Sequence, residues 1–547
     1  MKRAFWFDES YTDQQMVDAM RTKKIHAVHF MKRYKNRSMT ENGAMGYRTT
    51  GKALLDLNFK VSYLRDSDEE YIVEEFIKAY HESPKYAVKW LFYLRDILEG
   101  LGERRTFRIC LKYLAKSHFD IAKAVLPYIP QYGRYDDALV LLETELAGNV
   151  ASMYRRQLAQ DLKDMEQHRP VSLLAKWLPS INTSSAQTRK YAGILCRYFQ
   201  MSPKVYRQTL SKLRAYSNVV ESKMSASNWS EIDYETVPAK ANMIYDKAFE
   251  KHDIYRRYLY LIKVFMGDGK INANGLMPYE IVHRITKNGF YGGLREDNLA
   301  EMLWKKIIED GFKNEWGFED AIVVADGSGS MYAKASGSSS VLAIEICNSL
   351  AIYFAEQLKG VFHNKAITFS GHPEFIDLQD DTSLRDKLEI MRAYSDVANT
   401  NIEAVFNLIL DMAKCQNVPR EELPKQVLII SDMEFDQATA SGYVPWENEK
   451  WDRPNETLFR KIERRYQENG YRMPRLIFWN VCGRTNTIPK VDNEEGLCLL
   501  SGFSQNAMRV AANKQKKDPY EALIALLDSP RYRVIGEACG DPLAQKG

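Results

Sequence analysis

The sequence VVADGSGSMY at residues 323–332 is the clearest indication of the fold of the C-terminal part of this chain. A run of β-branched apolar residues, typical of a buried strand, stops at Asp326, and glycines alternate with serines directly after it. The glycines permit a tight turn, and the alternate spacing of Asp326, Ser328 and Ser330 directs three oxygen-bearing side chains toward one point. We therefore expect a strand that ends in a ligand-binding loop.

The chain beyond residue 320 continues this rhythm, because short apolar runs alternate with amphipathic helical segments. Strands of this kind are typical of a mostly parallel sheet that is covered by helices on both faces. The sequence therefore predicts a doubly wound α/β domain. The expected strands are 321–325, 365–370, 426–431, 475–482 and 496–501, and the expected helices between them are 340–358, 401–413 and 457–470.

The region before it has a different pattern. From about residue 65 to 315, apolar residues recur at three- and four-residue spacing in segments such as EEYIVEEFIKAYHE (69–82) and RTFRICLKYLAKS (105–117). Consecutive amphipathic helices with short turns pack as antiparallel pairs and build a curved, HEAT-like helical repeat. The predicted divisions are an N-terminal arm (1–40), an α-helical repeat domain (41–315), the α/β domain (316–535) and a C-terminal tail (536–547).

Two further loops at the carboxyl edge of the predicted sheet carry oxygen ligands. Thr400 stands before a predicted helix, and Asp432 directly follows a predicted strand. Ligands of such sheets bind beyond the carboxyl ends of the strands, so we expect these side chains to meet those of the first loop. Mg²⁺ prefers a near-octahedral shell of oxygens and retains some of its waters. The predicted ligands of Mg²⁺, or of another divalent cation, are Asp326, Ser328, Ser330, Thr400 and Asp432.

This constellation resembles the metal-ion-dependent adhesion site (MIDAS) of von Willebrand factor A domains. The family pattern is D-x-S-x-S, then a loop threonine, then an aspartate at a strand end, and the three parts occur here in that order. The resemblance implies a doubly wound domain that binds magnesium. It also implies that an acidic group of a partner protein, or an internal residue, completes the shell of the cation.

The net charge of +4 conceals an asymmetry. Residues 1–300 contain 47 of the 76 Lys and Arg but only 35 of the 72 Asp and Glu, so the first part is basic and the remainder is acidic. No acidic residue lies between Glu166 and Glu221. Such a run either creates a positive field suited to phosphates or is a solvated face whose acidic partners lie elsewhere in the fold. The candidate phosphate contacts are Arg189, Lys190, Arg197, Lys204, Arg207, Lys212 and Arg214, interspersed with Tyr191, Tyr198, Phe199, Tyr206 and Tyr216.

Several motifs resemble a TROVE-like family. They include NGAMGYRTTGKALLDL (42–57), LFYLRDILEGLGERRTFR (91–108), YGRYDDALVLL (132–142) and, near the other end, DPYEALIALLDSPRY (518–532). The likeness covers about residues 40–535 and extends more distantly to the Ro autoantigen family. In that family a ring of helical repeats, closed by a von Willebrand factor A domain, binds small non-coding Y RNAs and the single-stranded ends of misfolded RNAs. The resemblance thus implies an RNA-binding ring, with the basic run as its RNA contact.

A second cluster of arginines has a different interpretation. Arg104, Arg105 and Arg108 open a predicted helix within GERRTFR. Arginines in such a place often hold neighbouring helices together by hydrogen bonds and salt bridges. We expect a structural role for this cluster and not an RNA contact.

Catalytic interpretations of the same motifs fail. The serines at 328 and 330 do not give G-x-S-x-G, and Tyr332 stands where G-x-G-x-x-G needs its last glycine. GYRTTGKA (46–53) lacks the final hydroxyl and the preceding strand of a phosphate-binding loop. The predicted cation site also has too few carboxylates for a two-metal nuclease. We therefore expect a protein that is not an enzyme.

The remaining features favour a cytoplasmic protein. The first residues lack the apolar core of a signal peptide, and no segment approaches the ~18 apolar residues of a membrane span. The seven cysteines contain no C-x-x-C pair and are interpreted as reduced thiols. The leading hypothesis is an RNA-binding scaffold. The alternative is a protein–protein adaptor whose metal site captures a carboxylate of its partner.

Overall fold

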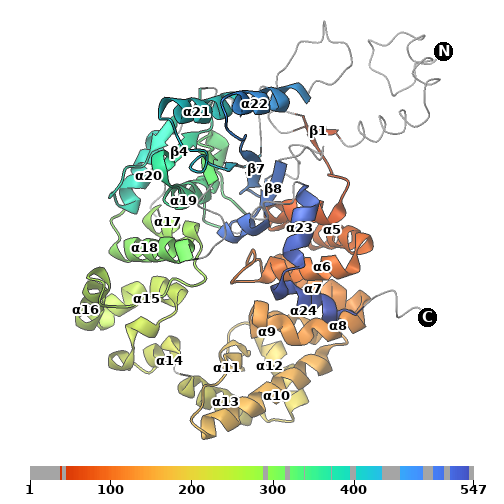
Figure 1. Cartoon of the computed structure of the whole chain (residues 1–547). Helices are drawn as coiled ribbons and strands as arrows, with labels where there is room; N and C mark the ends of the chain where they lie inside the picture. Colours follow the sequence, from red (N-terminus) through yellow and green to blue (C-terminus); the bar gives the residue numbers. More distant parts are fainter. Residues whose placement is uncertain are drawn as a thin grey trace, which may run out of the picture.

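The structure is a computed structural model of the whole chain (Figure 1). Helices form most of it, and one six-stranded sheet lies in the C-terminal part. The residues that the structure describes are 37–39, 45–217, 219–286, 293–313, 321–337, 339–370, 372–394, 402–433, 456–484, 497–510 and 518–540. Within these residues, no helix combines the length and the apolar character that crossing a bilayer requires.

The helical part runs to residue 313 and follows a short antiparallel hairpin of β1 (Arg37–Met39) and β2 (Met45–Tyr47). Its 3-10 helices are η1 (Leu126–Tyr128), η2 (Tyr135–Glu143), η3 (Trp229–Glu231) and η4 (Tyr234–Thr236). Its α-helices are α3 (Ala53–Phe59), α4 (Val61–Leu64), α5 (Glu69–Glu82), α6 (Pro84–Arg95), α7 (Arg105–Ser117), α8 (Phe119–Val125), α9 (Ile129–Tyr132), α10 (Ala147–Glu166), α11 (Leu174–Trp177), α12 (Ala186–Phe199), α13 (Pro203–Tyr216), α14 (Val220–Ser225), α15 (Ala239–His252), α16 (Ile254–Phe265), α17 (Pro278–Thr286) and α18 (Asn298–Lys313).

Local signals explain where several of these helices begin. Asp68 caps α5 by accepting a hydrogen bond from the Tyr71 N–H (2.7 Å). Ser202 caps α13 in the same way through the Val205 N–H, and a proline follows the cap at the first helical position. The predicted helices at 69–82 and 105–117 are confirmed with these bounds.

The sheet of the C-terminal part has the strand order β5-β4-β3-β6-β7-β8. All neighbours are parallel except β4 and β5, which are antiparallel. The strands are β3 (Ala321–Ala325), β4 (Lys365–Thr368), β5 (Phe375–Asp377), β6 (Gln426–Ser431), β7 (Arg475–Asn480) and β8 (Leu497–Ser501). The helices are α19 (Ala343–Ala355), α20 (Leu384–Ala393), α21 (Ile402–Cys415), α22 (Glu456–Glu468), α23 (Pro519–Leu527) and α24 (Pro530–Ala538), with η6 (Gly329–Tyr332), η7 (Gly360–Phe362) and η8 (Gln505–Val510).

These elements confirm the predicted fold class of a helical part followed by an α/β part. Each of the five predicted strands is present, and the short edge strand β5 was not predicted. The central strands β3 and β6 are fully buried, which agrees with their continuous apolar sequences.

The two parts meet at both ends, so the chain follows a closed path. At one junction α17 packs on α19, and at the other the C-terminal helices α23 and α24 pack on α6. Figure 1 shows the circuit that results, from α5 through α10 and α13 to α16 and α18, and back through the α/β part. The last helices of the chain therefore lie against the first ones.

Candidate cation site and basic helical face

The cation site predicted at the sheet edge begins with two buried carboxyl groups. Asp326 directly follows β3 and Asp432 directly follows β6, and these two strands are neighbours in the sheet. Asp326 is 3% exposed and Asp432 is 1% exposed. Burial, and next the negative charge of Asp432, raise the pKa of Asp326 to about 6. The pair therefore resists carrying two negative charges unless a cation is present.

The serines of the first loop lie at the same edge. The Ser328 N–H donates to Asp326 Oδ1 (2.9 Å), and the hydroxyl oxygens of Ser328 and Ser330 are 3.0 Å apart. A side chain at Gly329 would meet open space, so the glycine is not required by packing. The structure thus brings four of the five predicted ligands to one edge. Thr400, the fifth, lies outside the described residues.

Two further residues at this edge were not predicted. Ser431, the last residue of β6, forms a side-chain hydrogen bond that lowers the pKa of Asp326 and so opposes part of the effect of burial. Arg484, from the segment after β7, places Nη1 4.0 Å from Asp432 Oδ2. Neither residue stands in the D-x-S-x-S pattern, and only the order of the strands brings them to the site.

The donor set fits a hard divalent cation. Two carboxylates and two hydroxyls at one edge of the sheet supply the oxygen ligands that Mg²⁺ prefers, with water for the remaining positions. Among the described residues there is no cluster of three or more His, Cys, Asp or Glu that would suit zinc or a similar metal.

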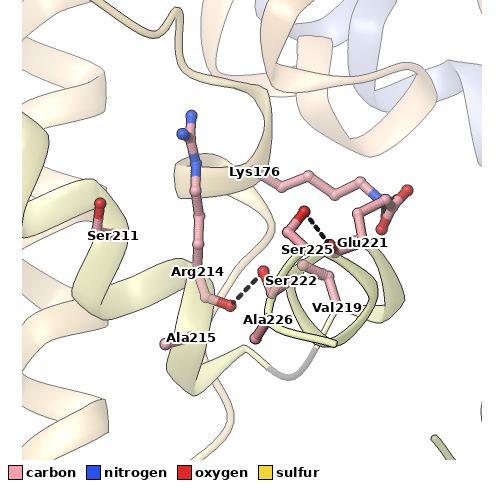
Figure 2. A pocket seen from close by; sticks show the side chains of 9 residues that line it. All are labelled: Lys176, Ser211, Arg214, Ala215, Val219, Glu221, Ser222, Ser225 and Ala226. Carbon is pink, nitrogen blue, oxygen red and sulfur yellow. Dashed lines mark hydrogen bonds and ion pairs between the residues drawn. The ribbon is translucent and has the colours of Figure 1, made fainter. Parts of the chain in front are cut away.

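The candidate phosphate contacts lie on α12 and α13, and three of them have partners within the protein. Arg214 donates to the carbonyl oxygens of Ala175 and Leu178 and to the Ser180 hydroxyl. Its donors therefore hold the segment around α11, so Arg214 has a structural role, and its predicted phosphate contact stays a prediction. Figure 2 shows its side chain extending away from α13 toward that segment.

Lys190 and Arg189 are also engaged. The Lys190 ammonium lies 2.7 Å from Glu143 Oε1, and the hydrogen bond from Lys190 is the main reason that the pKa of Glu143 falls to about 2. Arg189 donates to the carbonyl oxygens of Thr183 and Ser184. Lys190 is thus paired with a carboxylate that precedes the acid-free run, and its predicted phosphate contact, like that of Arg189, stays a prediction.

The other four cations stay available. Arg197, Lys204, Arg207 and Lys212 are exposed, and no described residue forms an ion pair with them. We call these four residues the basic face. Tyr198, beside Arg197, is the exposed one among the five aromatic residues of the run, while Phe199 and Tyr206 are buried in the core.

An open cavity of about 570 Å³ lies where α13 meets α14. Figure 2 shows its small lining residues, including Ser211 and Ser222, and the Lys176 side chain reaching across to Glu221 at 3.1 Å. Lys204, Arg207 and Ser211 follow one another at three- and four-residue spacing, so they share one side of α13. The basic face therefore leads along α13 into this cavity.

The arginine cluster that opens α7 has the structural role expected from the sequence. Arg105 donates to the carbonyl oxygens of Arg65 and Ser67, and Arg108 is paired with Asp136 and Asp137. These contacts join α7 to the segment after α4 and to η2. The prediction is confirmed for Arg105 and Arg108.

Comparison with known proteins adds the following. Two family models match the chain. Residues 40–130 and 144–314 match a domain of unknown function (DUF2828), and residues 320–529 match another domain of unknown function (DUF7788). The first match covers most of the helical part, and the second covers most of the α/β part.

A full-length relative and a solved structure are also similar. An uncharacterized protein of Acanthamoeba polyphaga mimivirus is 27% identical over 532 residues, which cover 90% of this chain and 87% of that protein. The crystal structure of the Ro (RSR) protein of Deinococcus radiodurans matches with a TM-score of 0.43 and 12% identity. That match covers 84% of this chain and 100% of the other.

Proposed function

We propose that this protein is a non-enzymatic RNA-binding scaffold that holds the phosphates of single-stranded or small non-coding RNA on the basic face. The observation that carries the proposal is the set of four exposed cations, Arg197, Lys204, Arg207 and Lys212, which have no carboxylate partner among the described residues. Other exposed lysines of the helical part are paired with glutamates, as Lys78 and Lys240 are, or stand singly on their helices, as Lys116 and Lys123 do. Cations without partners keep their field and attract a polyanion.

The arrangement suits a flexible strand better than a fixed base sequence. Lys204 and Arg207 lie one turn apart on α13, and Ser211, one turn further along the same side, adds a hydroxyl at the cavity that can donate to a phosphate or ribose oxygen. Tyr198, 47% exposed, offers a ring on which a base can stack. The sequence resemblance described above implies the same class of partner.

We further propose that the cation site binds Mg²⁺ through Asp326, Ser328, Ser330 and Asp432, with Thr400 as the remaining protein ligand. Two buried carboxyl groups that repel one another support this proposal. The cation would supply positive charge for an acidic group of a partner. The adaptor hypothesis draws on the same observation and is the second candidate.

The test of RNA binding is fluorescence anisotropy with a labelled single-stranded RNA. Replacing the basic face by glutamine (R197Q/K204Q/R207Q/K212Q) should weaken binding at least about tenfold at moderate salt. A control of equal charge change, K116Q/K123Q/K414Q/R472Q, alters exposed cations on other elements and should leave the affinity within about twofold. Equal affinity of both quadruple variants would contradict the proposal.

The adaptor hypothesis predicts a different result. Wild-type protein would then bind the RNA weakly or not at all, and its partner would dissociate on chelation of the metal or in the D326A variant. The two experiments separate the candidates, because the basic face and the cation site do not share a residue.

A further inference from the structure

An excess of positive charge surrounds two aspartates beside the start of α7. Asp136 and Asp137 lie next to each other in η2, and Asp137 is 0% exposed. The guanidinium groups around this pair, which we call the guanidinium cluster, belong to Arg95, Arg104, Arg108 and Arg134. Among the described residues, no further carboxylate forms an ion pair with any of the four. Four cations therefore meet two carboxylates, and the cluster has a surplus of two positive charges.

Three members of the guanidinium cluster are bonded to the aspartates. Arg95 Nε lies 2.8 Å from Asp137 Oδ2, and Arg108 Nε lies 2.8 Å from Asp137 Oδ1. Arg108 Nη2 and Arg134 Nη2 both donate to Asp136 Oδ2, at 2.7 and 3.1 Å. These contacts join α6, α7 and η2, so the three arginines have a structural role.

Arg104 is the member that is not bonded to the aspartates. Its side chain is exposed and forms no hydrogen bond or ion pair with a described residue. Partial burial, and next the charges of Arg134 and Arg108, lower the pKa of Arg104. Each of these two charges outweighs either aspartate, so the neighbouring charges repel Arg104 on balance. Local conflicts of this kind are typical of binding sites, where a ligand relieves them.

The short helix α11 connects this cluster to the basic face. It packs on η2, which begins directly after Arg134, and on α13, which carries part of the basic face. The Arg134 guanidinium lies 3.9 Å from the centre of the Trp177 ring, and the preceding residue, Lys176, lines the cavity between α13 and α14 (Figure 2). A helix is about 10–12 Å across, so one strand of several nucleotides can span both sites.

We propose that Arg104, together with the remaining donors of Arg108 and Arg134, binds a phosphate group of the RNA strand that the basic face holds. Nη1 of Arg108 and Nη1 of Arg134 form no hydrogen bond with a described residue, so each arginine keeps a donor for an anion. Guanidinium groups match the geometry of phosphate oxygens. The inference rests on the proposed RNA binding and adds a contact on other elements than α12 and α13.

The salt dependence of RNA anisotropy in single variants tests this site. R104Q should weaken binding of a labelled single-stranded RNA about three- to tenfold at moderate salt and lower the salt slope by about 0.7, the value of one phosphate contact. K116Q removes an exposed lysine at the other end of α7 and should leave both quantities unchanged. An unchanged slope in R104Q would overturn the inference.

The quadruple variant of the basic face separates this inference from the proposed function. Weak binding by the quadruple variant with normal binding by R104Q would leave the proposed function standing and overturn the inference. Weak binding by R104Q with normal binding by the quadruple variant would keep the site and overturn the basic face. A wild type that binds no RNA would overturn both.

The stability of R104Q distinguishes a binding role from a structural role. Because its neighbours repel Arg104, the melting temperature of ligand-free R104Q should equal or exceed that of the wild type. R108Q, which leaves two carboxylates without a donor, should melt at a lower temperature. A fall of more than about 3 °C in R104Q would show that Arg104 is structural and would overturn the inference.

Calorimetry with inorganic pyrophosphate distinguishes the RNA strand from a free anion of the same chemistry. If the site takes an RNA phosphate, R104Q loses RNA affinity whether or not the wild type binds pyrophosphate. If R104Q loses pyrophosphate binding and retains the RNA affinity of the wild type, the site takes a free phosphate compound, and its assignment to RNA is overturned.

Discussion

At the scale of single residues, the chemistry concentrates in the pair Asp326 and Asp432. Both carboxyl groups are almost fully buried, and the charge of one raises the pKa of the other. Burial of like charges without a counter-ion is costly, so folding brings together two groups that favour a cation or a proton. The sheet holds them there, because Asp326 and Asp432 follow adjacent parallel strands.

The raised pKa predicts a specific pH dependence of metal-free protein. A carboxyl group whose pKa is raised from 3.8 to about 6 by folding contributes stability below pH 4, and that contribution is lost as the pH rises through about 6. The asparagine side chain of D326N is neutral at every pH and so avoids the cost of a buried negative charge. This variant should therefore raise the free energy of unfolding of the metal-free protein at pH 7 by about 1–3 kcal/mol. Denaturant unfolding of both proteins in EDTA at pH 4 and pH 7 measures the difference. A difference that does not change with pH would contradict the account.

Arg484 leads to a prediction about metal affinity. Its guanidinium lies 4.0 Å from the Asp432 carboxylate and therefore opposes a second positive charge at the site. R484A should bind Mg²⁺ more tightly than the wild type, by about three- to tenfold, as measured by calorimetry. The matched control is R472A, which removes an exposed arginine that precedes β7, at the opposite end of the strand from Arg484. Weaker binding by R484A would show that this side chain supports the site instead.

At the scale of elements, α12 and α13 divide their cations between structure and surface. Arg214 uses its guanidinium to hold the carbonyl oxygens around α11, while Lys212, two residues earlier, is exposed. Sequence proximity therefore does not group these residues by role. The direction of each side chain from the helix decides it.

This division predicts opposite effects of two neighbouring substitutions. R214A leaves three acceptors without their donor and should lower the free energy of unfolding by about 2–3 kcal/mol. K212A should change that free energy by less than about 0.5 kcal/mol and should weaken RNA binding instead. Urea unfolding and RNA anisotropy on both variants check the pair. Unaltered stability of R214A would refute its structural role.

The sequence predicts elements well where the signal is local. The apolar run QVLIIS gives β6 with its observed bounds, and EEYIVEEFIKAYHE gives α5. The helical apolar pattern of KYAVKWLFYLRDILEGL continues over residues 85–101, but α6 ends at Arg95, because the chain folds back and the Leu101 N–H donates to the Tyr93 carbonyl oxygen (3.1 Å). Asp96, which directly follows the end of α6, is therefore able to pair with Arg531, 435 residues later. No pattern in the neighbouring sequence indicates this contact.

The same limit applies to the sites. Asp326, Ser328, Ser330 and Asp432 could be grouped from the sequence because each follows a recognisable strand. The pairing of Lys190 with Glu143, 47 residues earlier, depends on how η2 packs beside α12 and has no trace in the acid-free run. Arg484 likewise reaches the site only through the strand order.

At the scale of the whole molecule, buried polar contacts close the circuit. Asp96, after α6, is 0% exposed and accepts hydrogen bonds from Arg531 Nη2 (2.7 Å) and the Tyr532 hydroxyl (2.9 Å) of α24. Near the cation site, Asp66 accepts from the Ser336 hydroxyl (3.0 Å) and the Gly337 N–H (2.7 Å). The helical part is thus tied to the C-terminal helices and to the segment that follows the first ligand loop.

Removal of the Asp96 carboxylate should open this junction. D96A leaves a guanidinium and a hydroxyl without their acceptor and should cost about 3–5 kcal/mol of the free energy of unfolding. E537A, at an exposed position of α24, should change it by less than about 0.5 kcal/mol. Thermal unfolding and limited proteolysis of α23 and α24 report the result. Equal stability of the two variants would contradict the role of this contact.

The salt dependence of RNA affinity shows whether the basic face binds phosphates. If the basic face binds phosphates, the logarithm of the association constant falls linearly with the logarithm of salt concentration, and each contact to a single strand contributes about 0.7 to the slope. The variant R197Q/K204Q/R207Q/K212Q should then show a slope smaller by about 3 than that of the wild type. Equal slopes for the two proteins would show that the RNA is held elsewhere, and would contradict the account.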